Sequence, residues 1–159
     1  MMRPYEARDL EWVMRTADKA WRGINASYRK IFGDELFAIL VPDEHTRKGA
    51  EMRWTCTDHP EVVFICEENG TRVGFVTGII DRPRGIGIIG NNAVDPDCGL
   101  KGIGQQMYRY VLDMFRAEGM RFANVDMGLD EGHAPARRAY ERAGFDISIS
   151  SIRYYMKLA

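Results

Sequence analysis

The feature that most constrains this sequence is a glycine-containing turn that leads directly into an amphipathic helix. Residues 94–104 read Val-Asp-Pro-Asp-Cys-Gly-Leu-Lys-Gly-Ile-Gly, which predicts a strand end followed by a turn. Apolar residues then recur with the i, i+3, i+4, i+7 spacing of a buried helix face: Tyr108, Val111, Leu112 and Phe115. The first N–H groups of a helix lack backbone partners and attract anions. Because Gly102 and Gly104 have no Cβ, the turn predicts a site for a phosphorylated ligand.

A second motif follows in residues 133–145 and indicates which ligand this is. It reads His133-x-x-Ala136-x-x-x-Tyr140-x-x-x-Gly144-Phe145. Together with the turn Gly99-x-x-Gly102-x-Gly104, it resembles the general N-acetyltransferase (GNAT) superfamily, whose members transfer acetyl from acetyl-coenzyme A. The resemblance is specific over residues 94–145 and architectural before them.

Two positions depart from the patterns of that superfamily. Its pyrophosphate loop begins with Gln or Arg where this sequence has Gly99, and its second motif begins with Asn where this sequence has His133. The first change removes one side chain near the phosphates but leaves the backbone amides. The second changes a polar contact near the pantetheine arm, so we expect His133 to be a polar positioning group.

The resemblance implies acetyl-CoA as cofactor and a continuous binding surface for it. The pyrophosphate is expected at the turn, and the pantetheine arm between the strand ending at Val94 and the next strand. The implied cofactor-binding residues are Ala93, Val94, Leu100, Lys101, Gly102, Ile103, Gly104, Gln105, His133, Ala136 and Tyr140.

Acetyl transfer to an amine also needs groups that move protons. The family places its general acid at Tyr140, which would protonate the departing thiolate. A lysine-like amine has a pKa near 10.4, so its deprotonation at pH 7 costs about 4–5 kcal/mol and requires a base or a water chain. Asp126 is the best carboxylate candidate for that base, whereas Asp130 is expected to be a solvated loop residue. The residues expected to bind the acceptor are Asn91, Asn92 and Tyr154.

A different glycine motif occurs at residues 85–90, which match the dinucleotide fingerprint Gly-x-Gly-x-x-Gly. That fingerprint requires a strand before it and a helix after it. Here Asp81-Arg-Pro-Arg84 precedes the glycines, and Pro96 follows too soon for a helix. The segment is therefore interpreted as a strand, and a nucleotide-binding Rossmann unit is rejected.

Composition limits the remaining classes. With 22 basic and 23 acidic residues interleaved along 159 positions, the chain predicts one domain over 1–159 and no nucleic-acid partner. Three unpaired cysteines indicate free thiols in a cytoplasmic protein. No apolar run approaches the roughly 18 residues of a membrane span, and the first residues lack the apolar core of a signal peptide. His45 and His59 have no ligand-spaced neighbours, so no metal site is expected.

The order of strands and helices predicted from the apolar periodicity matches that of the GNAT superfamily, and the resemblance implies an α/β (α+β) fold with a mixed, mostly antiparallel seven-stranded sheet flanked by helices. Helices are expected from Asp9 to Trp21 and over 28–41, 44–57, 105–115 and 134–143. Strands are expected over 2–5, 62–67, 72–80, 86–94 and 121–127, with a closing pair over 146–150 and 152–158.

Three functions remain open at this point. The first is an acetyl-CoA-dependent N-acetyltransferase that moves acetyl to a primary amine, on a small molecule or a peptide, by direct attack in a ternary complex. The second is a catalytically silent acetyl-CoA sensor of the same fold. The lack of a candidate general base in strand 86–94 supports it, whereas the presence of Tyr140 argues against it. The third is an interaction domain using residues 28–57. No feature decides the oligomeric state, and a homodimer is left open.

Overall fold

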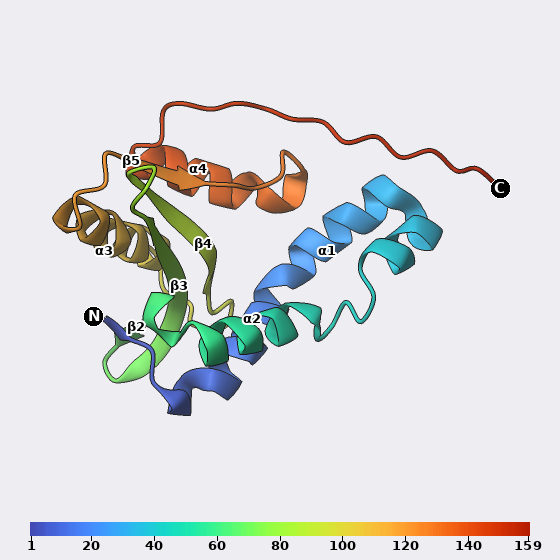
Figure 1. Ribbon diagram of the computed structural model, residues 1–159. Coiled ribbons are helices and arrows are strands. Elements are labelled where there is room, and N and C mark those ends of the chain that lie inside the picture. The colour runs from blue at the N-terminus through green and yellow to red at the C-terminus, as the bar shows by residue number, and fades with distance from the viewer.

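Five strands form one mixed sheet in the computed structural model, which describes residues 1–159 (Figure 1). The strands lie in chain order across the sheet. The first four pair antiparallel, and β5 pairs parallel to β4. Their bounds are Met2–Pro4 for β1, Val63–Glu68 for β2, Thr71–Asp81 for β3, Ile86–Val94 for β4 and Phe122–Val125 for β5.

Four helices cover the two faces of this sheet (Figure 1). They are α1 (Leu10–Leu40), α2 (Arg47–Asp58), α3 (Ile103–Ala117) and α4 (Ala134–Ala143). Short 3-10 turns precede α1 (η1, Ala7–Asp9), β2 (η2, Pro60–Val62) and α4 (η3, Glu131–His133). The predicted α/β fold with a mixed sheet flanked by helices is confirmed. None of the helices combines the length and apolarity needed to cross a lipid bilayer.

The helix α1 is longer than the sequence predicted, because residues 22–27 continue the helix that was expected to end near Trp21. Gly23 opposes helix formation most strongly in that stretch, at a cost of about 1 kcal/mol relative to alanine. The buried Ser27 packs on the loop before α4, where its hydroxyl accepts a hydrogen bond from the Gly132 N–H at 3.2 Å. The helix departs from regular geometry at Gly33, whose φ of 74° turns its last residues.

Two apolar cores lie on opposite faces of the sheet, because successive strand residues point to alternate sides. Helices α1 and α2 pack through Val13 and Met52 on one face, against Ile65 and Phe75. Helices α3 and α4 cover the other face with Met107, Tyr108, Val111, Phe115 and Tyr140. The second core therefore brings together the two motifs found in the sequence.

The C-terminal residues do not form the expected closing strands, so the prediction of seven strands is wrong and the sheet has five. Residues 145–159 contain no regular secondary structure. They leave α4 and run past the far end of α1 rather than along β5 (Figure 1). Alternating apolar residues predict a strand, but a strand forms only where a sheet edge meets it.

Candidate active site

A β-bulge in β4 determines which side chains face the second core. Val76 of β3 pairs with Asn92, and Gly78 pairs with Ile89, so Thr77 alone faces both Gly90 and Asn91. The Thr77 hydroxyl donates a hydrogen bond to the Asn91 carbonyl at 3.0 Å. Because the extra residue changes the alternation, Ile89 and Asn92 lie on the same face although they are three positions apart. The bulge thus aims the Asn92 side chain at α3 and α4.

The same bulge marks the point where β4 and β5 separate. The two strands pair from Ile86 with Phe122 to Ile89 with Val125, and no pair follows. Residues 90–94 therefore have β3 on one side only, and their opposite backbone edge is open. Unpaired strand backbone of this kind can hydrogen-bond an extended ligand. The expected contact residues Ala93 and Val94 lie in this open half.

The glycine turn lies directly beyond the open half of β4. Gly102 is the N-cap of α3 with a left-handed φ of 81°, and no side chain caps the helix start. The first N–H groups of α3 therefore remain available to a ligand. A Cβ built on Gly104 would meet only the Tyr108 ring, at 3.7 Å or more, so the space above this backbone is open. Leu100, Lys101 and Gly102 are exposed at the rim of the turn.

Gln105 links this turn to the second motif. Its side-chain amide donates a hydrogen bond to the Ala139 carbonyl at 2.7 Å, which fixes α4 against the first turn of α3. Ile103 is buried in the core beneath the turn, and Ala136 is half-buried where α4 meets the same core. These contacts hold the two halves of the expected cofactor surface in one rigid arrangement.

Tyr140, Asn92 and Tyr108 form a buried polar cluster between the helices and β4. The Asn92 amide donates a hydrogen bond to the Tyr140 hydroxyl at 2.7 Å, and the Tyr108 hydroxyl donates to the Asn92 carbonyl oxygen at 2.9 Å. The two tyrosine rings pack together with their centroids 4.5 Å apart. Tyr140 is therefore a hydrogen-bond acceptor from Asn92, and its own O–H proton has no acceptor in the protein.

Burial keeps both hydroxyls of this cluster protonated. It raises the pKa of Tyr108 far above its ordinary value, with a smaller contribution from Tyr140. Burial also raises the pKa of Tyr140, and polar interactions with Tyr108 and Asn92 offset only part of that effect. At neutral pH, Tyr140 consequently presents a neutral O–H group.

Asn91 points to the other face of the sheet and meets a carboxylate that sequence reasoning missed. Its amide donates a hydrogen bond to Glu51 of α2 at 2.8 Å, and Lys48 lies 2.9 Å from the other carboxylate oxygen. Burial would raise the pKa of Glu51, but the hydrogen bonds from Lys48 and Asn91 outweigh it and lower the pKa overall. Glu51 is thus an ionised, half-exposed carboxylate beside the bulge.

His133 is paired with Asp130, and the expectation that Asp130 is a solvated loop residue is wrong. The Asp130 side chain is 4% exposed, and its Oδ1 lies 2.6 Å from His133 Nδ1. Burial would raise the pKa of Asp130, but the hydrogen bond with His133 contributes to an overall decrease. Arg137 holds this loop by donating to the Gly128 and Asp130 carbonyls at 2.9 and 2.8 Å. The pair fixes the orientation of the His133 ring at the start of α4.

Two other residues from the sequence prediction lie apart from this cluster. Asp126 follows β5 directly and is exposed, without a hydrogen-bond partner in the protein. Tyr154 lies on the C-terminal segment with 83% of its surface exposed. Neither side chain joins the polar cluster in this single chain.

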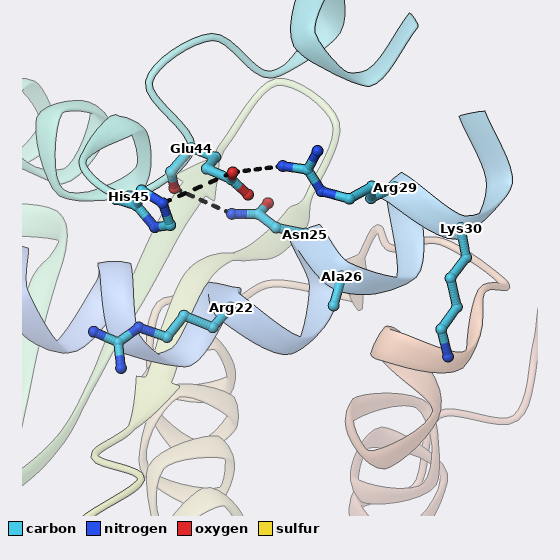
Figure 2. A pocket seen from close by; sticks show the side chains of 7 residues that line it. All are labelled: Arg22, Asn25, Ala26, Arg29, Lys30, Glu44 and His45. Carbon is cyan, nitrogen blue, oxygen red and sulfur yellow. Dashed lines mark hydrogen bonds and ion pairs between the residues drawn. The ribbon is translucent and has the colours of Figure 1, made fainter. Parts of the chain in front are cut away.

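A cavity of about 690 Å³ lies between α1 and the loop that leads to α2 (Figure 2). Arg29 donates to Glu44 at 2.5 Å across it, and Asn25 donates to the Glu44 carbonyl at 3.2 Å. Arg22 and Lys30 also line the cavity, and Figure 2 shows both side chains directed away from Glu44. Since neither has a carboxylate within ion-pair distance, this surface carries surplus positive charge.

No group of three His, Cys, Asp or Glu side chains gathers where it could hold a metal ion. The three cysteines are free, and Cys56 and Cys66 are buried. The polar groups that the site presents are the tyrosine hydroxyls, the asparagine amides, the carboxylate of Glu51 and the open backbone of β4.

Comparison with known sequences decides the family. Residues 21–145, which contain the glycine turn, the bulge and the second motif, match the acetyltransferase (GNAT) family. The chain belongs to the GNAT family. The S-(2-succino)cysteine N-acetyltransferase of Bacillus subtilis is 29% identical to this GNAT protein over 105 residues, which are 59% of this chain and 64% of that one. The chain spans only 64% and 57% of the length of the curated relatives that it matches.

Solved structures have the same fold. The PaiA N-acetyltransferase from Thermoplasma acidophilum, crystallised with coenzyme A, has a TM-score of 0.70 at 14% identity, covering 95% of this chain and 92% of that one. A GNAT acetyltransferase from Brucella melitensis, crystallised with acetyl-CoA, has a TM-score of 0.58 at 18% identity, covering 92% and 82%. The GNAT fold is thus shared over nearly the whole chain.

Proposed function

We propose that this protein transfers the acetyl group of acetyl-CoA to a primary amine by direct attack in a ternary complex. The observation that carries the proposal is the Tyr140 hydroxyl. Asn92 holds its oxygen at 2.7 Å, while its proton has no partner in the protein. The cluster lies on the strand half whose backbone edge is open, and that edge leads to the uncapped start of α3.

The residues present fit acetyl-CoA. The first N–H groups of α3 and the bare backbone at Gly102 and Gly104 would hold the pyrophosphate. The open edge of Ala93 and Val94 would hydrogen-bond the pantetheine amides, and His133 would position the arm near α4. When bound, acetyl-CoA supplies an activated acyl thioester. Two structures of this fold contain coenzyme A or acetyl-CoA.

In this proposal, Tyr140 acts as the general acid at the leaving sulfur. A tyrosine whose pKa is raised is a weaker acid than a thiol with a pKa near 8.5. Its O–H group therefore stays protonated before the reaction and donates a hydrogen bond to the departing sulfur. As the C–S bond breaks, the proton moves to the sulfur, and the tyrosinate takes up a proton from solvent. Asn92 keeps the hydroxyl oriented throughout, because its amide occupies an oxygen lone pair and leaves the proton free.

The acceptor amine must lose a proton before or during attack. Tyr108 and Tyr140 fill the space beside Asn92 on the sheet face that α3 and α4 cover. We therefore place the amine on the opposite face of the sheet, to which the Asn91 side chain points. Glu51 lies there and is ionised, so it can accept the proton directly or through a water. We propose Glu51 as this base in preference to Asp126, which is exposed, has no hydrogen-bond partner in the protein and follows the last residue of β5 that pairs with β4.

The Bacillus subtilis relative acts, by its name, on S-(2-succino)cysteine. Amino acids with additional carboxylates therefore belong in the first set of acceptors to be tested.

The experiment is an amine panel in which release of free coenzyme A is measured with a thiol reagent. The panel contains neutral amines, polyamines, peptides with free N-termini, and amino acids with one to three carboxylates. We expect acetyl-CoA-dependent release with at least one class, and release slower by roughly 10²-fold or more from a Tyr140→Phe protein assayed under the same conditions. Binding of acetyl-CoA without release for any amine would instead support a sensor, and the absence of binding would contradict both functions.

A further inference from the structure

Asp130 is a buried carboxylate with only one of its two oxygens hydrogen-bonded. Its Oδ1 lies 2.6 Å from His133 Nδ1. The other oxygen, Oδ2, is buried and has no hydrogen-bond partner in the protein. Burial of a polar atom without a partner costs free energy, so the stability of the fold does not explain why a carboxylate occupies this position. Its effect on His133 offers another reason.

The surroundings hold the two side chains in one geometry. A Cβ on Gly128 would overlap Asp130 Oδ1 and would lie 3.1 Å from His133 Nδ1. A Cβ on Gly132 would lie 3.0 Å from Asp130 Oδ2. The Tyr28 ring of α1 packs against the imidazole with the ring centroids 5.9 Å apart. The two glycines therefore make room for the pair, and α1 limits the movement of the imidazole.

The carboxylate determines which nitrogen of the His133 ring carries the proton. Although burial favours the neutral acid, interactions with His133 help to lower the pKa of Asp130 overall, so its side chain is ionised at neutral pH. An ionised carboxylate only accepts hydrogen bonds, so Nδ1 must be the donor. In the neutral ring Nε2 is then unprotonated, and it has no hydrogen-bond partner in the protein. His133 can therefore accept a hydrogen bond from a ligand at Nε2.

His133 lies on the same face of α4 as Tyr140. It is the N-cap of the helix, and Ala136 and Tyr140 follow it at the i+3 and i+7 positions that share one face. Seven residues of helix span about 10 Å, so His133 and Tyr140 are two turns apart. The residue between them on this face, Ala136, has a small side chain. An extended ligand that runs along this face would pass both residues.

We propose that Asp130 is a positioning residue that keeps His133 as a hydrogen-bond acceptor for an amide N–H of the pantetheine arm. This role rests on the proposed binding of acetyl-CoA. The amide groups of the arm carry N–H donors, and the unprotonated Nε2 is the matching acceptor. Without the carboxylate, either nitrogen of the ring could carry the proton, and the acceptor would be lost in part of the molecules.

Calorimetric titration of acetyl-CoA into Asp130→Asn protein tests this role. The new amide can donate to Nδ1 and so move the ring proton to Nε2, which then cannot accept a hydrogen bond. We expect the dissociation constant to rise roughly tenfold, as for the loss of one hydrogen bond. As the control, Glu131→Gln removes an exposed negative charge from the same loop and should change the constant by less than about twofold. Equal effects of the two substitutions would contradict the role of Asp130.

A double-mutant cycle separates this role from a structural one. The amide of an asparagine carries a donor and an acceptor together and needs no partner to fix a tautomer. In a His133→Asn background, Asp130→Asn should therefore have almost no further effect on the affinity for acetyl-CoA. The same tenfold loss in both backgrounds would show that Asp130 acts through the fold. If the unmodified protein does not bind acetyl-CoA, the proposed function itself is contradicted; if it binds and Asp130→Asn binds equally well, only the role of Asp130 is overturned.

The tautomer can also be observed in the unmodified protein, which does not depend on the folding of any variant. Long-range ¹H–¹⁵N correlation spectra distinguish protonated from unprotonated ring nitrogens, and the signals that disappear in His133→Asn assign this ring. At alkaline pH, where a histidine ring is neutral, we expect a protonated Nδ1 and an unprotonated Nε2. The Nε2 signal should shift upfield when acetyl-CoA is added. A protonated Nε2, or an Nε2 signal that acetyl-CoA does not move, would overturn the proposal.

Discussion

The two halves of β4 have similar lengths but serve different purposes. Residues 86–89 are paired on both sides, with β3 and with β5. Their Gly87 leaves room for the Phe115 ring, which occupies the place where a Cβ would be. Residues 90–94 begin with a bulge, have one free edge and carry the two asparagines. One strand therefore combines a closed half that stabilises the fold with an open half that can bind and orient a ligand.

Among substitutions at the site built on the open half, Tyr140→Phe should have the largest effect on the rate of acetyl transfer. The substitution keeps the ring packing against Tyr108 and Phe145 but removes the proton donor. We expect kcat to fall roughly 10²–10⁴-fold, with little change in the affinity for acetyl-CoA. Single-turnover kinetics with calorimetric titration would measure both. Full turnover in the variant, where chemistry limits the rate, would remove the acid role from Tyr140.

Substitution in the closed half should change the free energy of unfolding instead of the rate of acetyl transfer. In Gly87→Ala, the new methyl group overlaps the Phe115 ring, which is 2% exposed and cannot move aside. Overpacking of this kind costs about 1–3 kcal/mol of the free energy of unfolding. Urea denaturation would measure it, and the folded fraction should keep its kcat. As the control, Gly23→Ala on the exposed side of α1 has free space and should stabilise the protein by about 0.5–1 kcal/mol. Similar losses in both variants would show that Gly87 is not specially constrained.

The smallest expected effect is on kcat/KM, in a comparison of substitutions at Glu51 and Asp126. Glu51→Gln keeps the size of the side chain and a carbonyl oxygen that can accept the hydrogen bond from Asn91. The amide cannot act as a base, so we expect kcat/KM to fall roughly tenfold at neutral pH. The loss should be restored in part at higher pH, where more of the amine is already neutral. Asp126→Asn is the matched control and should have little effect. If Asp126→Asn causes the larger loss, the base assigned from the sequence is the correct one.

The sequence predicted the regular elements well, because they follow from local patterns. The apolar periodicity gave residues 86–94 and 134–143 with the bounds that the structure has, and the glycines after Val94 predicted a turn into a helix. The C-terminal strands were predicted from the same kind of pattern and are absent. The apolar pattern of a segment does not show whether the edge of a sheet will be available for it to pair with.

The site was only partly predictable, for a related reason. Tyr140 and Asn92 could be named from motif and strand, but their hydrogen bond joins residues 48 positions apart. The contact between Glu51 and Asn91 depends on how α2 packs beside β4, and the bulge exists only in the pairing of β4 with β3. Asp130 was the one missed residue with a local signal, since it precedes His133 by three positions at the start of a helix.

The most direct test of the account is calorimetric titration of acetyl-CoA into the unmodified protein and the Gly104→Val variant. The space above Gly104 can hold a larger side chain without disturbing the core, so the variant should fold normally by circular dichroism and thermal unfolding. The branched side chain would then lie where the pyrophosphate must approach the helix start. We expect binding to the unmodified protein and no detectable binding to the variant. Unchanged affinity in a folded Gly104→Val protein would contradict the placement of the cofactor at this turn.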